Sequence, residues 1–219
     1  MKKMLLIFAL FAGVCSAQTN VQIYYDFGSQ YRNQQVTTTI EHNSFDTFGS
    51  NFFFVDFDFG LQGNSPFSVY TEYARSLNFW KNTKAKDFSL HIEYNGGCAI
   101  GYGMQHTGLI GVEYMLHSAD YRYFITFAAL ARYTQGVRVP VQGTIVWGCE
   151  FVKGLVFSGF ADLYENSGFA VLSEPQLWYN IGTLFGLDNL HVGAEIELSY
   201  NFAGRGFMCN PCLGIKWNL

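Results

Sequence analysis

The chain is poor in charged residues and in cysteine, and each shortage excludes a class of protein. Charged residues make up 14% of its 219 residues, with 13 Lys and Arg against 17 Asp and Glu. A chain with so few cations lacks the basic surface that phosphate binding needs, which excludes nucleic acid as a partner. Five cysteines are also too few for a scaffold held together by disulfides.

Long apolar runs are missing too, except near the N-terminus. Lys2 and Lys3 precede an apolar stretch over 4–14, and Cys15-Ser-Ala17 places small residues where a signal peptidase cleaves. We predict a signal peptide over 1–17 and a mature chain over 18–219, with lipidation of Cys15 as the alternative. Loss of two lysines leaves 11 basic and 17 acidic residues, a net charge of −6. The absence of a later run of about 18 apolar residues excludes spanning helices.

Aromatic residues are abundant at 18%, and apolar residues alternate with polar ones over long stretches. An exported chain of this kind is either a secreted all-β domain or an outer-membrane β-barrel. Over 207–219 the odd positions are mostly apolar and the even positions mostly small or polar, and 190–202 shows the same period. Such stripes exceed the roughly 9–11 residues that a tilted strand needs to cross a bilayer, and also the ~5–6 residues typical of soluble strands. We predict an all-β, transmembrane antiparallel β-barrel.

The alternation predicts about twelve strands, an even number as in single-chain bacterial barrels. Their predicted ranges are 20–30, 35–46, 49–60, 66–79, 87–95, 108–118, 121–133, 139–152, 154–165, 173–184, 188–202 and 205–219. Tight turns at 118–120, 153–154 and 185–187 predict the periplasmic end. Longer connections at 95–107 and 165–172 predict the extracellular end.

If the apolar stripes face lipid, the opposite stripes line an acidic lumen. By parity they carry twelve carboxylates against three Arg or Lys residues, which favours neutral or cationic polar solutes. The alternative is that these side chains pair with one another and plug a narrow barrel. The predicted lining and ligand-binding residues are Glu41, Phe52, Phe54, Asp56, Asp58, Glu72, Glu93, Glu113, Arg122, Arg132, Trp178, Glu195 and Glu197.

Several segments resemble the Tsx-like nucleoside-specific outer-membrane channels. They are Gly63-Asn-Ser-Pro-Phe-Ser-Val-Tyr-Thr-Glu-Tyr-Ala-Arg-Ser76, Thr39-Ile-Glu-His-Asn-Ser-Phe-Asp46 and the Phe-rich stretch 52–59. The segments Leu172-Ser-Glu-Pro-Gln-Leu-Trp-Tyr-Asn180 and Gly214-Ile-Lys-Trp-Asn-Leu219 are similar to bacterial relatives of that family. The resemblance implies a monomeric twelve-stranded barrel whose narrow pore takes nucleosides. It implies pore lining by Glu41, Asp56, Asp58 and Glu72, and stacking surfaces on Phe52 and Phe54.

Other functions have weaker support in the sequence. A non-conducting structural or surface-recognition barrel would need the loops as its site, and these are short. A lipid-modifying enzyme would need a nucleophile beside a base, but His42, Ser44 and His106 are scattered and neither G-x-S-x-G nor H-E-x-x-H occurs. We expect no catalytic residues, cofactor or bound metal.

The spacing Cys209-Asn-Pro-Cys212 is typical of thiol redox sites and zinc sites. In a strand, however, a separation of three places the two side chains on opposite faces. We predict a lipid-facing Cys209 and a lumen-facing Cys212 within the last strand.

Overall fold

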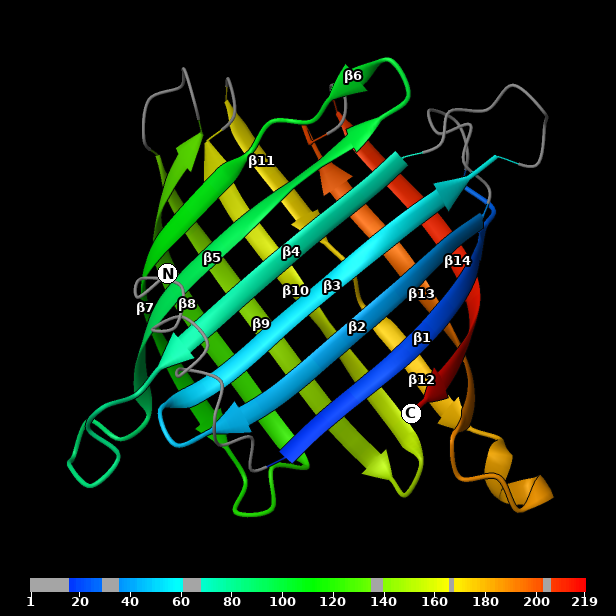
Figure 1. Ribbon diagram of the computed structural model, residues 1–219, viewed down its shortest axis with the longest axis horizontal. Helices are drawn as coiled ribbons and strands as arrows, with labels where there is room; N and C mark the ends of the chain where they lie inside the picture. Colours follow the sequence, from blue (N-terminus) through cyan, green and yellow to red (C-terminus); the bar gives the residue numbers. More distant parts are fainter. Residues whose placement is uncertain (1–15, 29–35, 61–67, 135–139, 166–167, 203–205) are drawn as a thin grey trace, which may run out of the picture.

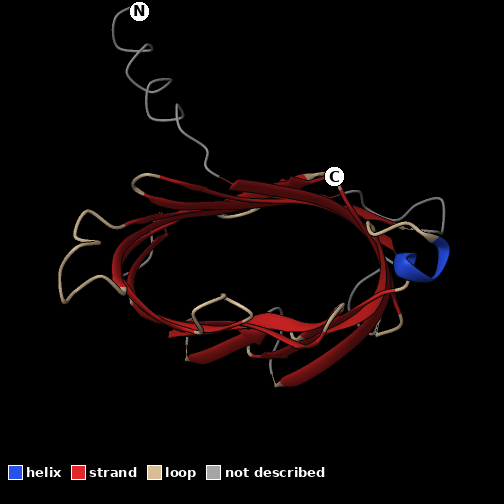
Figure 2. Cartoon of the chain, turned by 90° about the horizontal axis from the view of Figure 1, so that it is seen from below, coloured by secondary structure: helices blue, strands red, loops and turns tan. Residues whose placement is uncertain are grey.

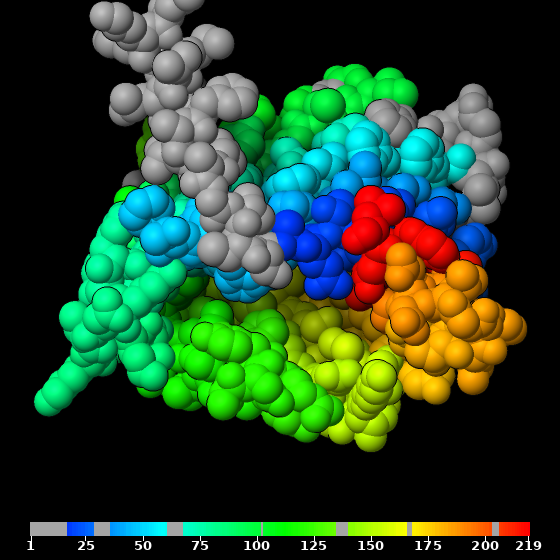
Figure 3. Space-filling model, turned by 60° about the horizontal axis from the view of Figure 1, so that its bottom comes forward, coloured from blue at the N-terminus to red at the C-terminus, as the bar shows by residue number. Residues whose placement is uncertain are grey.

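Antiparallel strands form a closed barrel in the computed structural model of the chain (Figure 1), which describes residues 16–28, 36–60, 68–134, 140–165, 168–202 and 206–219. Most strands pair with the strands next to them in the sequence, and the first strand also pairs with the last. Viewed along the barrel, the strands form a complete oval ring (Figure 2). The first and last strands, blue and red, lie side by side on the surface (Figure 3).

The strands have the following bounds in chain order. They are β1 (Ser16–Asp26), β2 (Val36–Asp46), β3 (Gly49–Phe59), β4 (Ser68–Leu77), β5 (Phe88–Ala99), β6 (Tyr102–Gly103), β7 (Thr107–His117), β8 (Tyr123–Thr134), β9 (Val141–Val152), β10 (Leu155–Glu165), β11 (Phe169–Ser173), β12 (Gln176–Asn180), β13 (Leu190–Tyr200) and β14 (Phe207–Asn218). A short 3-10 helix, η2 (Gly182–Phe185), precedes β13. Among the described residues, no helix is both long and apolar enough to cross a membrane.

The barrel wall has twelve strand positions in the described part of the chain. β11 and β12 share one position, because both pair with β10 on one side and with β13 on the other. β6 is a two-residue extension that pairs only with the end of β5. The predicted barrel of about twelve antiparallel strands is therefore confirmed.

One predicted strand, 173–184, is wrong in its bounds. The wall here starts earlier, at Phe169, breaks after Ser173 and ends at Asn180. The break falls at Pro175, which has no N–H to donate to a ladder. Opposite the break, Gly159 has a φ of +153°, and a Cβ there would lie 2.5 Å from the Glu174 carbonyl oxygen. The predicted connection over 165–172 is correspondingly shorter.

The side chains are arranged inside out compared with a soluble sheet. In β1, Ile23 is 53% exposed whereas Gln22 is 1% exposed, and in β7, Val112 is 51% exposed whereas Glu113 is 7% exposed. Apolar residues thus cover the outside of the wall and polar residues fill its interior. A secreted soluble domain would bury the opposite stripe, so this pattern decides between the two classes that the sequence left open.

The two rims differ in their connections. Short turns such as 47–48 and 153–154 lie at the rim where the chain ends at Leu219, which we call the turn end. The strands β1, β3, β5, β8, β10 and β13 end at the opposite rim, which we call the loop end. The predicted signal peptide falls largely on 1–15, outside the described residues. Ser16 and Ala17 pair with Phe45 and Ser44 in the β1–β2 ladder.

Cys209 and Cys212 lie in an unbroken β14, on opposite faces as predicted. Cys209 is exposed on the outside, and Cys212 faces inward with its thiol 4.0 Å from the Asn210 carbonyl oxygen. Pro211 is tolerated because the ladder to β1 ends at Cys212, and the Pro211 carbonyl still accepts a hydrogen bond from Phe27 N at 3.0 Å. The spacing therefore belongs to a strand, and the two thiols do not converge.

One charged pair lies on the outward face, near the turn end. Arg75 faces Asn51 and Ile92 across its two ladders, and neither ladder shows a register shift there. Its Nη2 lies 2.9 Å from both carboxylate oxygens of Asp46, and both side chains are largely buried. The opposite charge of Asp46 offsets the cost of placing Arg75 on this face.

We expect Arg75→Met and Asp46→Asn each to lower the free energy of unfolding by about 2 kcal/mol, because each leaves a largely buried charge without its partner. The double variant should cost clearly less than the sum of the single variants. Urea unfolding in lipid vesicles measures all four proteins, and additive losses would contradict the pairing.

Candidate functional site

The interior of the barrel contains carboxylates that are held by neutral donors. Asp58 on β3 accepts hydrogen bonds from Thr37 Oγ1 at 2.8 Å and from Ser68 Oγ at 2.6 Å. Asp56, two residues earlier, accepts one from Thr39 Oγ1 at 2.5 Å. Hydroxyl donors orient a carboxylate without cancelling its charge. These hydroxyl donors thus fix both carboxylates in place.

The same arrangement recurs around the wall. Tyr70 donates to Glu72 at 2.7 Å, and Thr144 donates to Asp162 at 2.6 Å. On β13, Glu197 accepts a hydrogen bond from Asn210 Nδ2 at 3.2 Å. These neighbours also contribute no positive charge to the interior.

A chain of contacts crosses the β1–β14 seam and joins two of the predicted carboxylates. In order, its members are Glu41, Gln22, Tyr24, Trp178, Gln176 and Glu195. Trp178 Nε1 donates to Gln176 Oε1 at 2.9 Å, and Gln176 Nε2 donates to Glu195 at 2.5 Å. The predicted residues Glu41, Trp178 and Glu195 are therefore joined through Gln22, Tyr24 and Gln176.

Two inward-facing cations, Arg132 on β8 and Lys216 on β14, lie over aromatic rings. The guanidinium of Arg132 lies 4.2 Å from the ring centroid of Tyr164, and its Nη1 donates to Gln142 at 2.7 Å. Lys216 Nζ lies 4.2 Å from the ring centroid of Trp178. In the described residues, the Arg and Lys ion pairs lie near the turn end instead, between Arg75 and Asp46, Lys86 and Asp87, and Arg122 and Glu150. Ring faces thus position the interior cations.

His91 connects two more of the predicted carboxylates. Its Nδ1 lies 2.8 Å from Glu113 on β7, and its Nε2 lies 3.0 Å from Glu93 on its own strand. Glu93 in turn accepts a hydrogen bond from Asn95 at 3.2 Å. Glu93 also interacts electrostatically with Glu72 of β4, which extends this cluster around the wall.

Two glycines let large rings lie flat against the wall. Trp178, Gly193, Gly214 and Tyr24 form one direct row across β12, β13, β14 and β1. A Cβ on Gly193 would lie 2.4 Å from the Trp178 ring, and one on Gly214 would lie 2.8 Å from the Tyr24 ring. The rings therefore occupy the space that side chains at these positions would take. This arrangement keeps the rings beside the wall instead of across the lumen.

The other predicted residues have mixed positions. Phe52 and Phe54 lie on the inward parity of β3, where their rings are 6.1 Å apart, and Phe54 lies 6.0 Å from Tyr70. Arg122, in contrast, lies at the turn-end rim, where it is exposed and pairs with Glu150 at 3.1 Å. It is placed at a mouth of the barrel and not within the strands.

Of the groups considered for an enzyme, His42 and His106 form hydrogen bonds with residues other than Ser44. His42 Nδ1 shares a hydrogen bond of 2.8 Å with Thr19, and its ring stacks on Phe53. His106 is hydrogen-bonded to Tyr94 near the loop end. Within the described residues, no group of three His, Cys, Asp or Glu side chains is arranged to hold a metal ion.

The family of the chain follows from a family model that covers almost all of it. The model for a domain of unknown function, DUF5020, matches residues 17–219. The chain belongs to the DUF5020 family. No curated protein matches the sequence.

Solved structures share the fold of this DUF5020 chain. The NanC porin aligns with a TM-score of 0.58 and 9% identity, over 92% of this chain and 100% of that one. The KdgM porin in complex with disordered oligogalacturonate aligns with a TM-score of 0.55 and 7% identity, over 91% of this chain and 98% of that one. At such identities the likeness shows the fold alone, a closed antiparallel β-barrel.

The row of rings and glycines is a packing arrangement that can be tested directly. We expect Gly214→Val to lower the free energy of unfolding by about 1–3 kcal/mol, because its side chain must displace the Tyr24 and Trp178 rings. Adding Tyr24→Ala makes room, so the double variant should lose less than the sum of the two single variants. Unfolding in detergent or lipid gives these values.

The matched control is Gly143→Val on the outward face of β9, where a Cβ meets nothing within 4 Å. We expect Gly143→Val to keep or slightly raise stability. Equal losses for the two valine variants would show that the rings do not depend on Gly214.

Proposed function

We propose that this chain is a monomeric outer-membrane channel for the passive passage of small polar solutes, with neutral or cationic solutes favoured. A barrel with an apolar outside and an ionic inside is stable only in a membrane, and the solved porins of the same fold support an outer-membrane location. The observation that carries the proposal is the set of interior carboxylates held by neutral donors. This set gives the lumen a fixed negative charge.

The charge of the lumen determines which solutes it favours. Asp56 and Asp58 accept hydrogen bonds from hydroxyl groups, while Arg132 and Lys216 lie over rings. A low-dielectric wall concentrates such a field, which repels anions and attracts cations. Oligogalacturonate, the solute in the KdgM structure, is anionic. The lumen described here is better suited to an uncharged polar ring.

Nucleosides are the solute class that we propose to test first. Ring surfaces on Phe54 and Tyr70 lie beside the Glu72 carboxylate, a combination that stacks a flat base and hydrogen-bonds its edge. The resemblance of β2–β4 to the Tsx-like channels supports the same class, although residues 61–67 of that stretch lie outside the described residues.

A barrel that is closed at rest is the second candidate, and the packing of the interior favours it. Gln22, Leu109, Leu130, Gln142 and Trp178 point inward, and each is at most 2% exposed. Side chains packed so closely narrow the lumen. In that case the surface loops would carry the function. Measuring conductance separates the two candidates.

We expect the purified protein to form cation-selective channels in planar bilayers. Replacing Asp56 and Asp58 with Asn removes two fixed charges while the hydroxyl donors keep an oxygen acceptor. The ratio of cation to anion permeability should fall by about two- to threefold. Reversal potentials in a KCl gradient measure the ratio.

A charge-matched control removes the exposed carboxylates Glu165 and Asp188 instead, as Glu165→Gln with Asp188→Asn. This pair should leave the ratio unchanged. Equal effects of the two double variants would assign the selectivity to the surface charge. No conductance from a protein that shows heat-modifiable gel migration would rule out the channel and favour the closed barrel.

Solute preference can be tested with pairs that differ in a single charged group. In liposome swelling we expect galactose to enter at least about fivefold faster than galacturonate, and uridine faster than its monophosphate, because the acidic lumen repels the anions. Faster entry of the anionic member of either pair would contradict the proposed acidic lumen. Uridine no faster than a sugar of similar size would remove the nucleoside assignment alone.

A further inference from the structure

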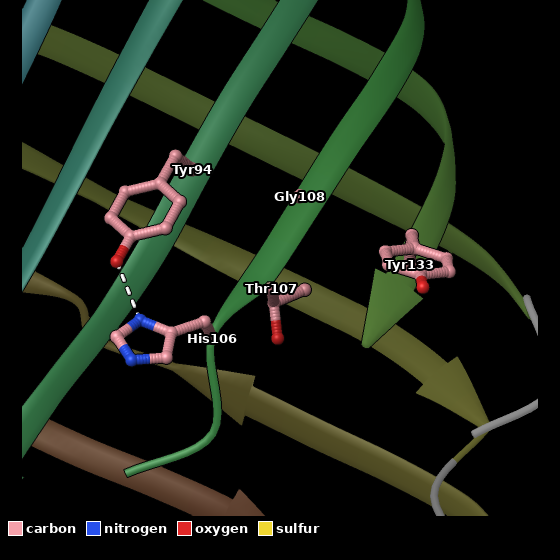
Figure 4. A pocket seen from close by; sticks show the side chains of 5 residues that line it. All are labelled: Tyr94, His106, Thr107, Gly108 and Tyr133. Atoms are coloured by element: carbon pink, nitrogen blue, oxygen red, sulfur yellow. Dashed lines mark hydrogen bonds between the residues drawn. The ribbon is translucent and has the colours of Figure 1, made fainter. Parts of the chain in front are cut away.

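A groove on the outward face of the barrel is built around a glycine between two tyrosines. Tyr94 on β5, Gly108 on β7 and Tyr133 on β8 pair directly with one another across adjacent strands. Both rings point outward, with Tyr94 43% exposed and Tyr133 60% exposed. They stand on either side of Gly108 (Figure 4), where a Cβ would meet nothing within 4 Å. The missing side chain therefore leaves an open slot.

His106 extends one wall of this slot. Its ring stacks against Tyr94, with centroids 5.9 Å apart and planes inclined by 19°, and the two groups share a hydrogen bond of 2.6 Å. A second glycine provides the space, since a Cβ on Gly96 would lie 2.6 Å from His106 Nδ1. The groove has a volume of about 300 Å³ and is lined by Tyr94, His106, Thr107, Gly108 and Tyr133.

The position of the groove indicates what it meets. Its tyrosines belong to the outward stripe, which faces lipid, so the groove is continuous with the membrane-facing surface. It also lies at the loop end, because Thr107 is the first residue of β7 and Tyr133 the last but one of β8. A site at this height on an outer-membrane barrel lies where the headgroups of the outer leaflet begin.

The chemistry of the walls selects a class of ligand. The backbones of Tyr94 and Tyr133 are separated by two strand spacings, ~9.6 Å, which leaves room for one ring between two aromatic side chains. Hydroxyl and imidazole groups at the rim can exchange hydrogen bonds with a polar edge. None of the five lining residues is Lys or Arg, so the groove is not built for a phosphate. An acyl chain would contact the rings but leave the polar rim without partners.

We propose that this groove binds a sugar ring from the headgroup of an outer-leaflet glycolipid. The sugar lies over Gly108 between the faces of Tyr94 and Tyr133, and its hydroxyls bond at His106 and the Tyr133 hydroxyl. This inference rests on the proposed outer-membrane location but not on conduction. A barrel that conducts nothing would leave it intact.

The test uses the refolded full-length protein in detergent with deep-rough lipopolysaccharide, and native mass spectrometry counts the bound molecules. We expect one retained glycolipid per barrel. Gly108→Leu fills the slot from its floor and should weaken binding at least about tenfold. Tyr133→Ala removes one wall and should weaken binding as well. Gly143→Leu is the matched control, because Gly143 is also outward with nothing within 4 Å of its Cβ, and it should bind as the unmodified protein does.

Two further probes distinguish the sources of the ligand. Phosphatidylethanolamine should bind more weakly than the glycolipid and should not respond to Gly108→Leu. Free N-acetylglucosamine should bind much more weakly than the glycolipid, because it lacks the anchoring lipid. Three results would each overturn the proposal: equal glycolipid retention by Gly108→Leu and Gly143→Leu, phosphatidylethanolamine binding that is lost in Gly108→Leu, or tight binding of the free sugar. Heat-modifiable migration verifies that each variant is folded.

Discussion

The pairing of β1 with β14 is the constraint on which the rest of the structure depends. In hydrocarbon each unpaired backbone N–H or C=O costs several kcal/mol, so a sheet with two free edges cannot remain in a membrane. The β1–β14 ladder pairs both edges with each other. Its register runs from Asn20 opposite Asn218 to Asp26 opposite Cys212. A slip of one residue would turn Gln22 and Tyr24 toward lipid. Closure and the polar lining are therefore fixed by the same register.

Once the barrel is closed, its polar side chains must satisfy one another in a confined space. Pairing each carboxylate with a cation would neutralise the interior, and this chain has too few cations for that. Instead, Thr, Ser, Tyr, Asn and Gln side chains hold the carboxylates, as Thr37 and Ser68 hold Asp58. Arg132 and Lys216 are positioned by ring faces. Neutral groups thus orient these carboxylates, and the proposed negative field of the lumen depends on this arrangement.

Much of the wall could be predicted from the sequence, because an apolar period of two sustained over ten or more residues fits a strand and does not fit a helix. The strand count and the inward side of Glu41, Asp58 and Glu113 follow from that period alone. The break at Pro175 was missed because alternation continues through it, and only the cross-strand position of Gly159 shows how the wall accommodates it.

The grouping of side chains within the lumen could not be predicted. The parity of a residue shows which face of the wall it lies on, but not its height along the barrel axis. Height depends on the register between strands, which single-strand periodicity does not contain. Arg122 illustrates this point, because its parity is shared with lining residues but its place just before β8 puts it at the rim. For the row of Trp178, Gly193, Gly214 and Tyr24, the sequence held one usable signal. It was the presence of glycine at inward positions within two strands.

Glycine has the same physical role on both faces of this wall, with different consequences. A glycine within a strand weakens the strand, so its presence calls for a compensating contact. Inside, Gly193 and Gly214 obtain that contact from Trp178 and Tyr24, whose rings cover the bare backbone. Outside, Gly96 obtains it from His106, whereas Gly108 has nothing above it within 4 Å. Gly143 is equally bare, but its cross-strand neighbours Ala129 and Leu163 form no aromatic walls. The slot at Gly108 differs from Gly143 in being framed on both sides by rings with polar tips, which is the arrangement expected where a ligand covers the backbone.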